Sequence, residues 1–144
     1  MSELIYLDEP HVLENMDFRY SKHEIYTAIS NILVAMNPYQ RLPQVYDDET
    51  LLRFKNATSR LEPHVFKLSR SAYLAMLKTK VNQSMVICGE SGAGKTETAK
   101  YVMRYLAVQV QDGKIIPTVG GSVEERVLAV NPILEAFGNS KTGH

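Results

Sequence analysis

The sequence predicts an α/β protein in which short strands form a sheet and longer helices lie on both of its faces. Two apolar runs, residues 32–36 and 85–88, have the length and composition of buried strands. Longer segments around them repeat their apolar residues at helical spacing. A glycine-rich stretch joins the second apolar run directly to one of these helical segments. The order of strand, glycine-rich loop and helix is typical of α/β folds.

The composition is that of an ordinary globular domain, or of part of a larger one. The 144 residues are 44% hydrophobic and 22% charged, which argues against disorder. Because 16 basic and 16 acidic residues cancel, we expect no nucleic-acid partner. We also expect no membrane span and no signal peptide, since no apolar run is long enough and the N-terminus lacks the required pattern. The single cysteine, Cys88, is predicted to be buried, in a reducing, intracellular setting.

A helix is predicted over residues 10–20, because Pro10 suits the first helical position and the apolar residues that follow share one face. Its inner stripe consists of Val12, Leu13, Met16 and Tyr20. His11 and Glu14 fall off that stripe, so we expect them to be solvated. His64, near the start of a later helix, is expected to be structural rather than catalytic.

A β-hairpin is predicted next. Residues 25–27 and 32–36 are β-prone runs that flank Ser30 and Asn31. Because residues 32–36 are all apolar, their strand is expected to be covered on both faces.

Residues 37–46 are predicted to be a structured loop, because Pro38 and Pro43 break regular structure. Loops that leave the strands of an open α/β sheet are where ligands bind. Tyr39 and Tyr46 could each offer a ring face to a base, and either could equally be a packing residue.

Two helices are predicted to follow this loop. The first covers residues 47–56, with Asp47 or Asp48 as its N-cap. The second covers residues 61–80, with Pro63 near its first position. Its inner stripe is expected to contain Val65, Leu68, Ala72, Tyr73, Met76 and Leu77.

The C-terminal third is predicted to contain two further helices. Residues 95–110 form the first, with Val102, Met103, Leu106 and Val110 facing inward. A surface loop is expected at residues 111–121. A capping box at Ser122 opens the last helix, which Pro132 should kink and Gly138 should end.

The glycine-rich stretch fits the phosphate-binding P-loop pattern G-x-x-x-x-G-K-[ST]. Its eight residues are Gly89, Glu90, Ser91, Gly92, Ala93, Gly94, Lys95 and Thr96. Glycines let the backbone turn sharply and approach an anion, and the helix that follows turns its positive dipole end toward the same point. Lys95 would reach the β- and γ-phosphates, and the Thr96 hydroxyl would bind Mg²⁺. A chance glycine-rich turn is the alternative, but four specified positions with the right flanks make it rare.

Several separated stretches together resemble the myosin motor head. These are Glu9-Pro10…Val12-Leu13…Arg19-Tyr20 with Ile25-Tyr26-Thr27, the run from Leu33 to Tyr39, Pro63-His64-Val65-Phe66, GESGAGKT with Glu97, and the run from Asn131 to Thr142. Their order and spacing agree over nearly the whole chain. Two departures stand out, since Glu62 replaces the first proline of the family's PPHxF motif and Thr98 stands where many members have Asn.

The resemblance implies a P-loop NTPase fold with a mixed central sheet, and a site for ATP and Mg²⁺. Residues 1–144 would be an incomplete, N-terminal part of the motor domain, with a purine loop at 37–46, the P-loop at 89–96 and the region leading to switch I at 131–142. Asn37, Pro38 and Tyr46 would bind the adenine. The loop carries one residue more than in many members, as in myosin VI-like branches, so Tyr39 is the alternative. Residues 111–121 would correspond to the loop that modulates nucleotide exchange.

The resemblance also implies an actin-based motor of the cytoplasm and actin cytoskeleton. Lys95 and Thr96, with Mg²⁺ and backbone N–H groups, would stabilise the charge that develops during in-line attack of water on ATP. In the family, switch I, switch II, the actin-binding region and the neck that carries light chains or calmodulin all lie further along the chain. The 144 residues alone are therefore expected to show weak or no ATPase, poor solubility and unpaired strand edges.

Two other functions remain open from the sequence. A truncated product could bind nucleotide without hydrolysis or movement. A small P-loop kinase or GTPase is the third possibility, although such enzymes usually carry the P-loop near the N-terminus. The only apolar run followed by Asp that could supply their second acidic motif, residues 106–112, has the pattern of a helix end.

Overall fold

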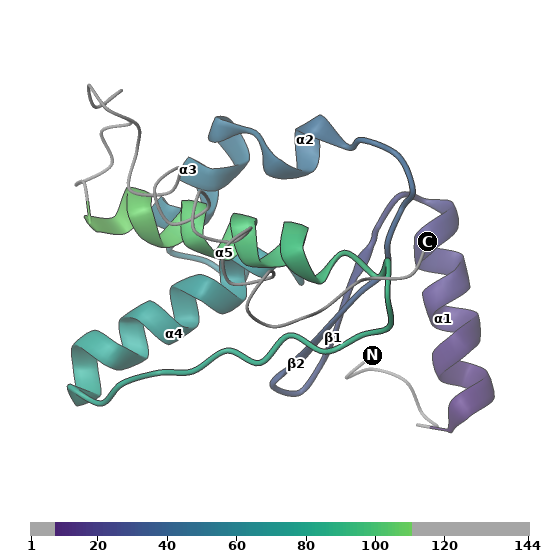
Figure 1. The fold of residues 1–144 in the computed structure, drawn as a ribbon, viewed down its shortest axis with the longest axis horizontal. Coiled ribbons are helices and arrows are strands. Elements are labelled where there is room, and N and C mark those ends of the chain that lie inside the picture. The colour runs from purple at the N-terminus through teal and green to yellow at the C-terminus, as the bar shows by residue number, and fades with distance from the viewer. Residues whose placement is uncertain (1–7, 111–144) are drawn as a thin grey trace. The chain divides into compact units, whose positions relative to one another are not determined.

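The computed structural model of the chain describes residues 8–110 (Figure 1). Its elements are α1 (Glu9–Ser21), β1 (Tyr26–Ile29), β2 (Ile32–Ala35), α2 (Pro43–Tyr46), α3 (Asp48–Asn56), α4 (Val65–Thr79) and α5 (Lys95–Val110). The chain divides into two compact units, Met1–Leu68 and Ser69–His144, and the boundary between them falls inside α4. The predicted loop at 111–121 and the predicted helix from Ser122 to Gly138 lie outside the described residues.

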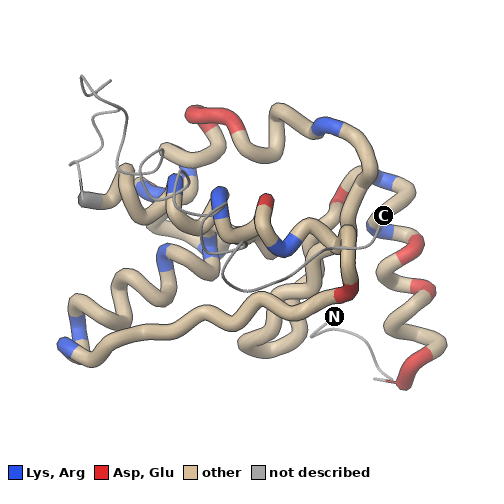
Figure 2. The backbone as a smooth tube through the Cα atoms, in the orientation of Figure 1, with Lys and Arg blue, Asp and Glu red and all other residues tan. Residues whose placement is uncertain are grey.

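Helix α1 is confirmed, and its ends have clear local causes. The Asp8 side chain caps it by accepting the backbone N–H of His11 at 3.1 Å, and Pro10 lies in its first turn. Acidic residues at the start and Arg19 in the last turn complement the helix dipole (Figure 2). The predicted inner stripe is only partly covered, because Leu13 is 57% exposed. His11 and Glu14 are exposed, as predicted.

The predicted hairpin is also confirmed. Strands β1 and β2 pair antiparallel, with Tyr26 opposite Ala35 and Ile29 opposite Ile32. Ser30, in the turn, has a positive φ of 52°. The expectation that the second strand is covered on both faces is wrong, since Ile32 is 66% exposed. Among residues 8–110 the sheet has two strands, so β1 is the only described strand beside this apolar run, and its residues Leu33 and Val34 are only half-buried.

One arginine joins α1 to the hairpin beside it (Figure 1). The Arg19 guanidinium donates from Nη2 to the Tyr26 carbonyl at 2.8 Å and from Nε to the Thr27 hydroxyl at 3.1 Å. Its third nitrogen, Nη1, pairs with Glu24 at 2.9 Å. Because Thr27 is buried, Arg19 satisfies a polar group that water does not reach.

Helices α2 and α3 follow the hairpin. The structured loop predicted at 37–46 contains the short helix α2, because Pro43 takes a helix-opening position instead of breaking regular structure there. Asp47 is the N-cap of α3, accepting the Thr50 N–H at 2.7 Å, which decides between the two candidate caps. The Thr50 hydroxyl donates to the Gln44 carbonyl at 3.0 Å and so joins α3 to α2.

Helix α4 begins at Val65, four residues later than predicted. Its first turn is buried, with Val65 at 1% and Phe66 at 0% exposure. The predicted stripe fails toward the C-terminal end, where Met76 and Leu77 are exposed. An amphipathic pattern is buried only where a neighbouring element covers it.

The strand predicted at residues 85–88 is absent from the described part of the chain. A strand is defined by hydrogen bonds to a neighbouring strand, and the only described sheet consists of β1 and β2. Cys88 is therefore exposed, not buried as predicted. Helix α5, in contrast, starts and ends at the predicted residues.

The buried side of α5 differs in part from the prediction. Its buried residues are Val102, Tyr105 and Val108, and burial raises the pKa of Tyr105 to about 12. Val102 was predicted to face inward, whereas Met103 and Leu106 are only half-buried. Val102, Tyr105 and Val108 follow one another at intervals of three residues, so the buried face of α5 is rotated relative to the predicted face.

Candidate functional site

The glycine-rich octet forms the turn that enters α5. Gly92 and Gly94 have positive φ values of 79° and 93°, a conformation that L side chains rarely adopt. Gly89 is needed for space, because a Cβ there would lie 3.0 Å from the Cβ of Ala93. The first hydrogen bond of α5 runs from the Thr98 N–H to the Gly94 carbonyl at 2.9 Å. Glycine at these three positions therefore lets the chain turn tightly into the helix N-terminus.

Lys95 folds back over this turn. Its ammonium donates to the carbonyl oxygens of Gly89 at 2.8 Å and Glu90 at 2.7 Å. These bonds place a positive charge against the loop from which α5 begins. An ammonium has three N–H donors, so it can bind an anion beside the loop as well as the loop itself.

The first turn of α5 offers one exposed hydroxyl, that of Thr96. The Thr98 hydroxyl is already used, since it donates to the Gly94 carbonyl at 3.0 Å. Glu97 pairs with Lys100 at 2.5 Å. Within residues 8–110, no group of three His, Cys, Asp or Glu side chains could hold a metal by itself. An exposed Thr96 fits Mg²⁺, which usually takes few protein ligands and completes its shell with phosphate oxygens and water.

The predicted purine loop lies in the first unit. Asn37 is held at its start, where its carbonyl accepts the Tyr20 hydroxyl at 3.4 Å and its side chain accepts the Tyr39 N–H at 2.9 Å. Tyr39 has a positive φ of 49° and is 85% exposed. Pro38 is half-buried beside it.

Tyr46, at the other end of the loop, is half-buried in an aromatic cluster. Its hydroxyl lies 2.7 Å from the Tyr26 hydroxyl. Its ring is within 6.4 Å of the ring centres of Tyr26, His64 and Phe66. Tyr46 is therefore the better held of the two candidate tyrosines.

His64 connects the loop to α4. Its Nδ1 accepts the Phe66 N–H at 3.0 Å, so the ring proton is on Nε2, which donates to the Val45 carbonyl at 3.0 Å. Burial lowers the pKa of His64 to about 4, which keeps it neutral. The geometry supports the structural role expected from the sequence. Its contact with the purine loop was missed, because residues 45 and 64 are distant in the chain and no local pattern links them.

Glu62, which departs from the family motif, pairs with Arg53 of α3. The hydrogen bond from the Arg53 guanidinium lowers the pKa of the Glu62 carboxyl. Both side chains are about half exposed, so the pair stabilises the fold only weakly.

The predicted site residues thus fall into two sets. Asn37, Pro38 and Tyr46 belong to the first unit, and residues 89–96 belong to the second. The residues predicted to bind the adenine all lie in segment 37–46, and those predicted to bind the phosphates all lie in segment 89–96.

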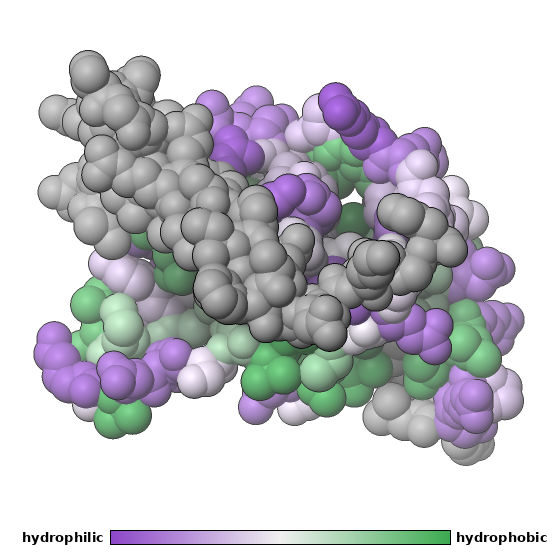
Figure 3. Space-filling view, in the orientation of Figure 1, coloured by the Kyte–Doolittle hydropathy of each residue, from purple (hydrophilic) through white to green (hydrophobic). Residues whose placement is uncertain are grey.

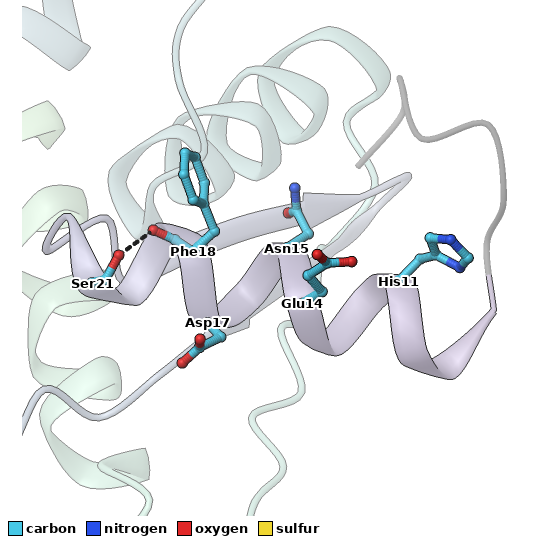
Figure 4. A pocket seen from close by; sticks show the side chains of 6 residues that line it. All are labelled: His11, Glu14, Asn15, Asp17, Phe18 and Ser21. Carbon is cyan, nitrogen blue, oxygen red and sulfur yellow. Dashed lines mark hydrogen bonds between the residues drawn. The ribbon is translucent and has the colours of Figure 1, made fainter.

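A separate hollow lies on the surface of α1 (Figure 4). It is lined by His11, Glu14, Asn15, Asp17, Phe18 and Ser21. Figure 4 shows Phe18 and Asp17 pointing to opposite sides of the helix, and the Ser21 hydroxyl donating to the Phe18 carbonyl at 2.8 Å. These side chains do not converge on one point, so we assign no binding to this hollow.

No helix among residues 8–110 is both long enough and apolar enough to cross a membrane.

The family model described as myosin head (motor domain) matches residues 1–144. Three proteins of Arabidopsis thaliana, Myosin-11, Myosin-9 and Myosin-5, are each 50% identical to this chain over 143 residues. The match covers 99% of this chain and 9% of each relative, so the chain spans only a small part of the curated relatives it matches. The chain therefore belongs to the myosin head family, as a part of the motor domain.

Proposed function

We propose that this chain is the N-terminal, ATP-binding part of an actin-based motor that couples hydrolysis of Mg-ATP to movement along actin filaments in the complete protein. The observation that carries the proposal is the octet at residues 89–96, in which left-handed glycines turn the chain into the N-terminus of a 16-residue helix. Membership of the myosin head family supports the same function.

The octet would bind the phosphates of ATP. The backbone N–H groups of residues 89–96 and the positive end of α5 suit an anion, because they offer several donors at one point. Lys95 would contact the β- and γ-phosphates, and Thr96 would be a ligand of Mg²⁺, as in other P-loops. Bound Mg²⁺ would neutralise part of the phosphate charge. In the first unit, Asn37, Pro38 and Tyr46 would bind the adenine.

Actin filaments, and light chains or calmodulin, would bind to regions outside these 144 residues. On this proposal the complete protein works in the cytoplasm, on the actin cytoskeleton. The alternatives are a nucleotide-binding module without motor activity and a small P-loop kinase. A kinase would transfer phosphoryl groups to a small acceptor, which a motor does not require.

The test is ATP binding and actin-activated ATPase of the complete protein, compared with the Lys95→Ala variant. We expect wild type to bind ATP and to hydrolyse it faster on actin, and the variant to lose both because the phosphates lose a charged partner. ATP binding without turnover would favour the binding module. Equal ATP affinity in wild type and variant would contradict the assignment of the P-loop.

A further inference from the structure

We propose that His64 and Tyr26 position the end of the purine loop, so that Tyr46 presents a fixed ring face to the base of the nucleotide. Neither residue is proposed to touch the nucleotide. Both act through the segment of Val45 and Tyr46, and so they are positioning residues. The inference rests on the proposed function, because it takes residues 37–46 to receive the adenine.

The first support is the pair of hydrogen bonds made by one imidazole. His64 donates to the Val45 carbonyl at 3.0 Å and accepts the Phe66 N–H at 3.0 Å. It thus ties the last turn of α2 to the first turn of α4. Helix α2 has only 4 residues, too few to be stable by its own hydrogen bonds. Its shape therefore depends on such outside contacts.

The second support is the bond between the hydroxyls of Tyr26 and Tyr46 at 2.7 Å. Tyr26 is 4% exposed and lies on β1, where it pairs with Ala35. The ring centres of Tyr26 and His64 are 4.9 Å apart, so the two anchors also pack against each other. The Tyr46 hydroxyl is therefore joined to the hairpin, and the carbonyl of the preceding residue, Val45, is joined through His64 to the first turn of α4.

The other candidate tyrosine has no comparable support. Tyr39 is 85% exposed, and its backbone N–H, not its ring or hydroxyl, donates to the Asn37 side chain. A ring that is fixed before binding loses less conformational freedom when a base stacks on it. The two anchors thus make Tyr46 the preorganised ring of this loop.

Two substitutions at residue 64 separate the two bonds of the imidazole. In His64→Asn the side-chain oxygen can take the place of Nδ1 and keep the cap on α4, but nothing reaches Val45. In His64→Gln the amide nitrogen can take the place of Nε2 and keep the bond to Val45. Affinities for ATP and for inorganic tripolyphosphate, each with Mg²⁺, are measured on the complete protein.

We expect His64→Asn to bind ATP about tenfold more weakly, as the loss of one partly buried hydrogen bond would predict, and to bind tripolyphosphate as wild type does. We expect His64→Gln to recover most of the ATP affinity. The matched control is His11→Asn, the same substitution at an exposed histidine, which should change neither affinity.

Tyr26→Phe gives a second, independent measurement, because it removes one hydroxyl and leaves the ring. We expect ATP binding to weaken about fivefold, with tripolyphosphate unaffected. Tyr73→Phe, at a half-buried tyrosine of α4, is its control and should bind ATP normally. If the His64→Asn variant does not fold, the ATP affinity of the Tyr26→Phe variant is the deciding measurement. An ATP affinity equal to that of wild type would then overturn the inference.

The outcomes for the inference and for the proposed function differ. Wild-type affinity for ATP in both His64→Asn and Tyr26→Phe overturns the inference alone. So does an equal loss of ATP and tripolyphosphate, which would mean that the substitutions do not act on the base. A wild-type protein that binds neither ligand contradicts the proposed function, and the inference falls with it.

Discussion

Single side chains hold both predicted binding segments by bonds to backbone oxygens. Lys95 donates to Gly89 and Glu90 in the octet, and His64 donates to Val45 in the purine loop. Arg19 does the same for the hairpin through the Tyr26 carbonyl. Each of these side chains donates to a main-chain carbonyl of another segment and so holds that segment in place.

Arg19→Ala should destabilise the first unit by about 2 kcal/mol, because it removes donors from the Tyr26 carbonyl and from the buried Thr27 hydroxyl. Hydrogen exchange of the β1 and β2 amides in the complete protein measures this. Arg60→Ala, at an exposed arginine, is the control and should leave exchange unchanged. Exchange as slow in Arg19→Ala as in wild type and Arg60→Ala would show that the Arg19 hydrogen bonds do not stabilise the hairpin.

The first turn of α4 should become less stable in acid. His64 has a pKa near 6.5 when unfolded and about 4 when folded, so the neutral form is the one that folding favours. Its contribution is complete above pH 6.5 and is lost as the pH falls toward 4, about 3 kcal/mol in all. Burial is the main cause of the lowered pKa; the hydrogen bond to the Val45 carbonyl and the Glu62 carboxylate oppose it, and the Arg53 guanidinium adds to it.

Hydrogen exchange at Phe66 and Leu68, corrected for the intrinsic effect of pH, should therefore speed up between pH 6.5 and 4.5. His64→Asn should abolish this dependence, since it has no titrating group there. His23→Asn, at an exposed histidine, should retain it. A wild-type profile that is flat over this range would contradict the neutral, buried imidazole.

At the scale of elements, the helices begin where a side chain or a proline prepares their first turn. Asp8 caps α1, Pro43 opens α2, Asp47 caps α3 and the His64 ring caps α4. Each capping side chain accepts a hydrogen bond from a backbone N–H of the first turn, and the proline has no N–H that would need an acceptor. The position of the cap or proline, more than the apolar pattern, decides the first residue of these four helices.

Asp47→Ala should destabilise α3 by about 1 kcal/mol, because the Thr50 N–H loses its acceptor. Asp48→Ala tests the other candidate and should cost less, since Asp48 lies inside the first turn and acts there through the helix dipole. Hydrogen exchange at Thr50 and Leu51 distinguishes them. A larger effect in Asp48→Ala would reverse the cap assignment.

At the scale of the whole molecule, the described residues leave large apolar side chains in contact with solvent (Figure 3). The most exposed of them include Val86 at 85%, Ile32 at 66%, Val81 at 60%, and Leu13 and Phe18 at 57% each. They come from a helix, a strand and the segment that leads to the octet. Apolar surface of this kind marks places where further protein packs.

The 144-residue chain produced by itself should therefore bind a hydrophobic dye such as ANS, and should melt without a cooperative transition. The complete protein should bind far less dye per molecule, because the same side chains would be covered. The control is dye binding by both proteins in denaturant, where they should not differ. A sharp thermal transition of the short chain without dye binding would contradict the prediction.

The sequence by itself determined the features that depend on local chemistry. The hairpin around Ser30, the helix from Lys95 to Val110 and the order of glycines in the octet follow from turn residues, periodicity and the need for positive φ. Family membership could also be inferred from separated motifs in the correct order.

Only the tertiary structure decided which apolar residues are buried and which side chains hold the loops. Residues 85–88 and 32–36 have the pattern of buried strands, yet Cys88 and Ile32 are exposed. A buried strand needs hydrogen-bonding neighbours and a covering layer, which a run of four or five residues does not itself contain. Likewise, His64 meets Val45 and Tyr26 meets Tyr46 across about twenty positions of sequence, because folding, not spacing, brings them together.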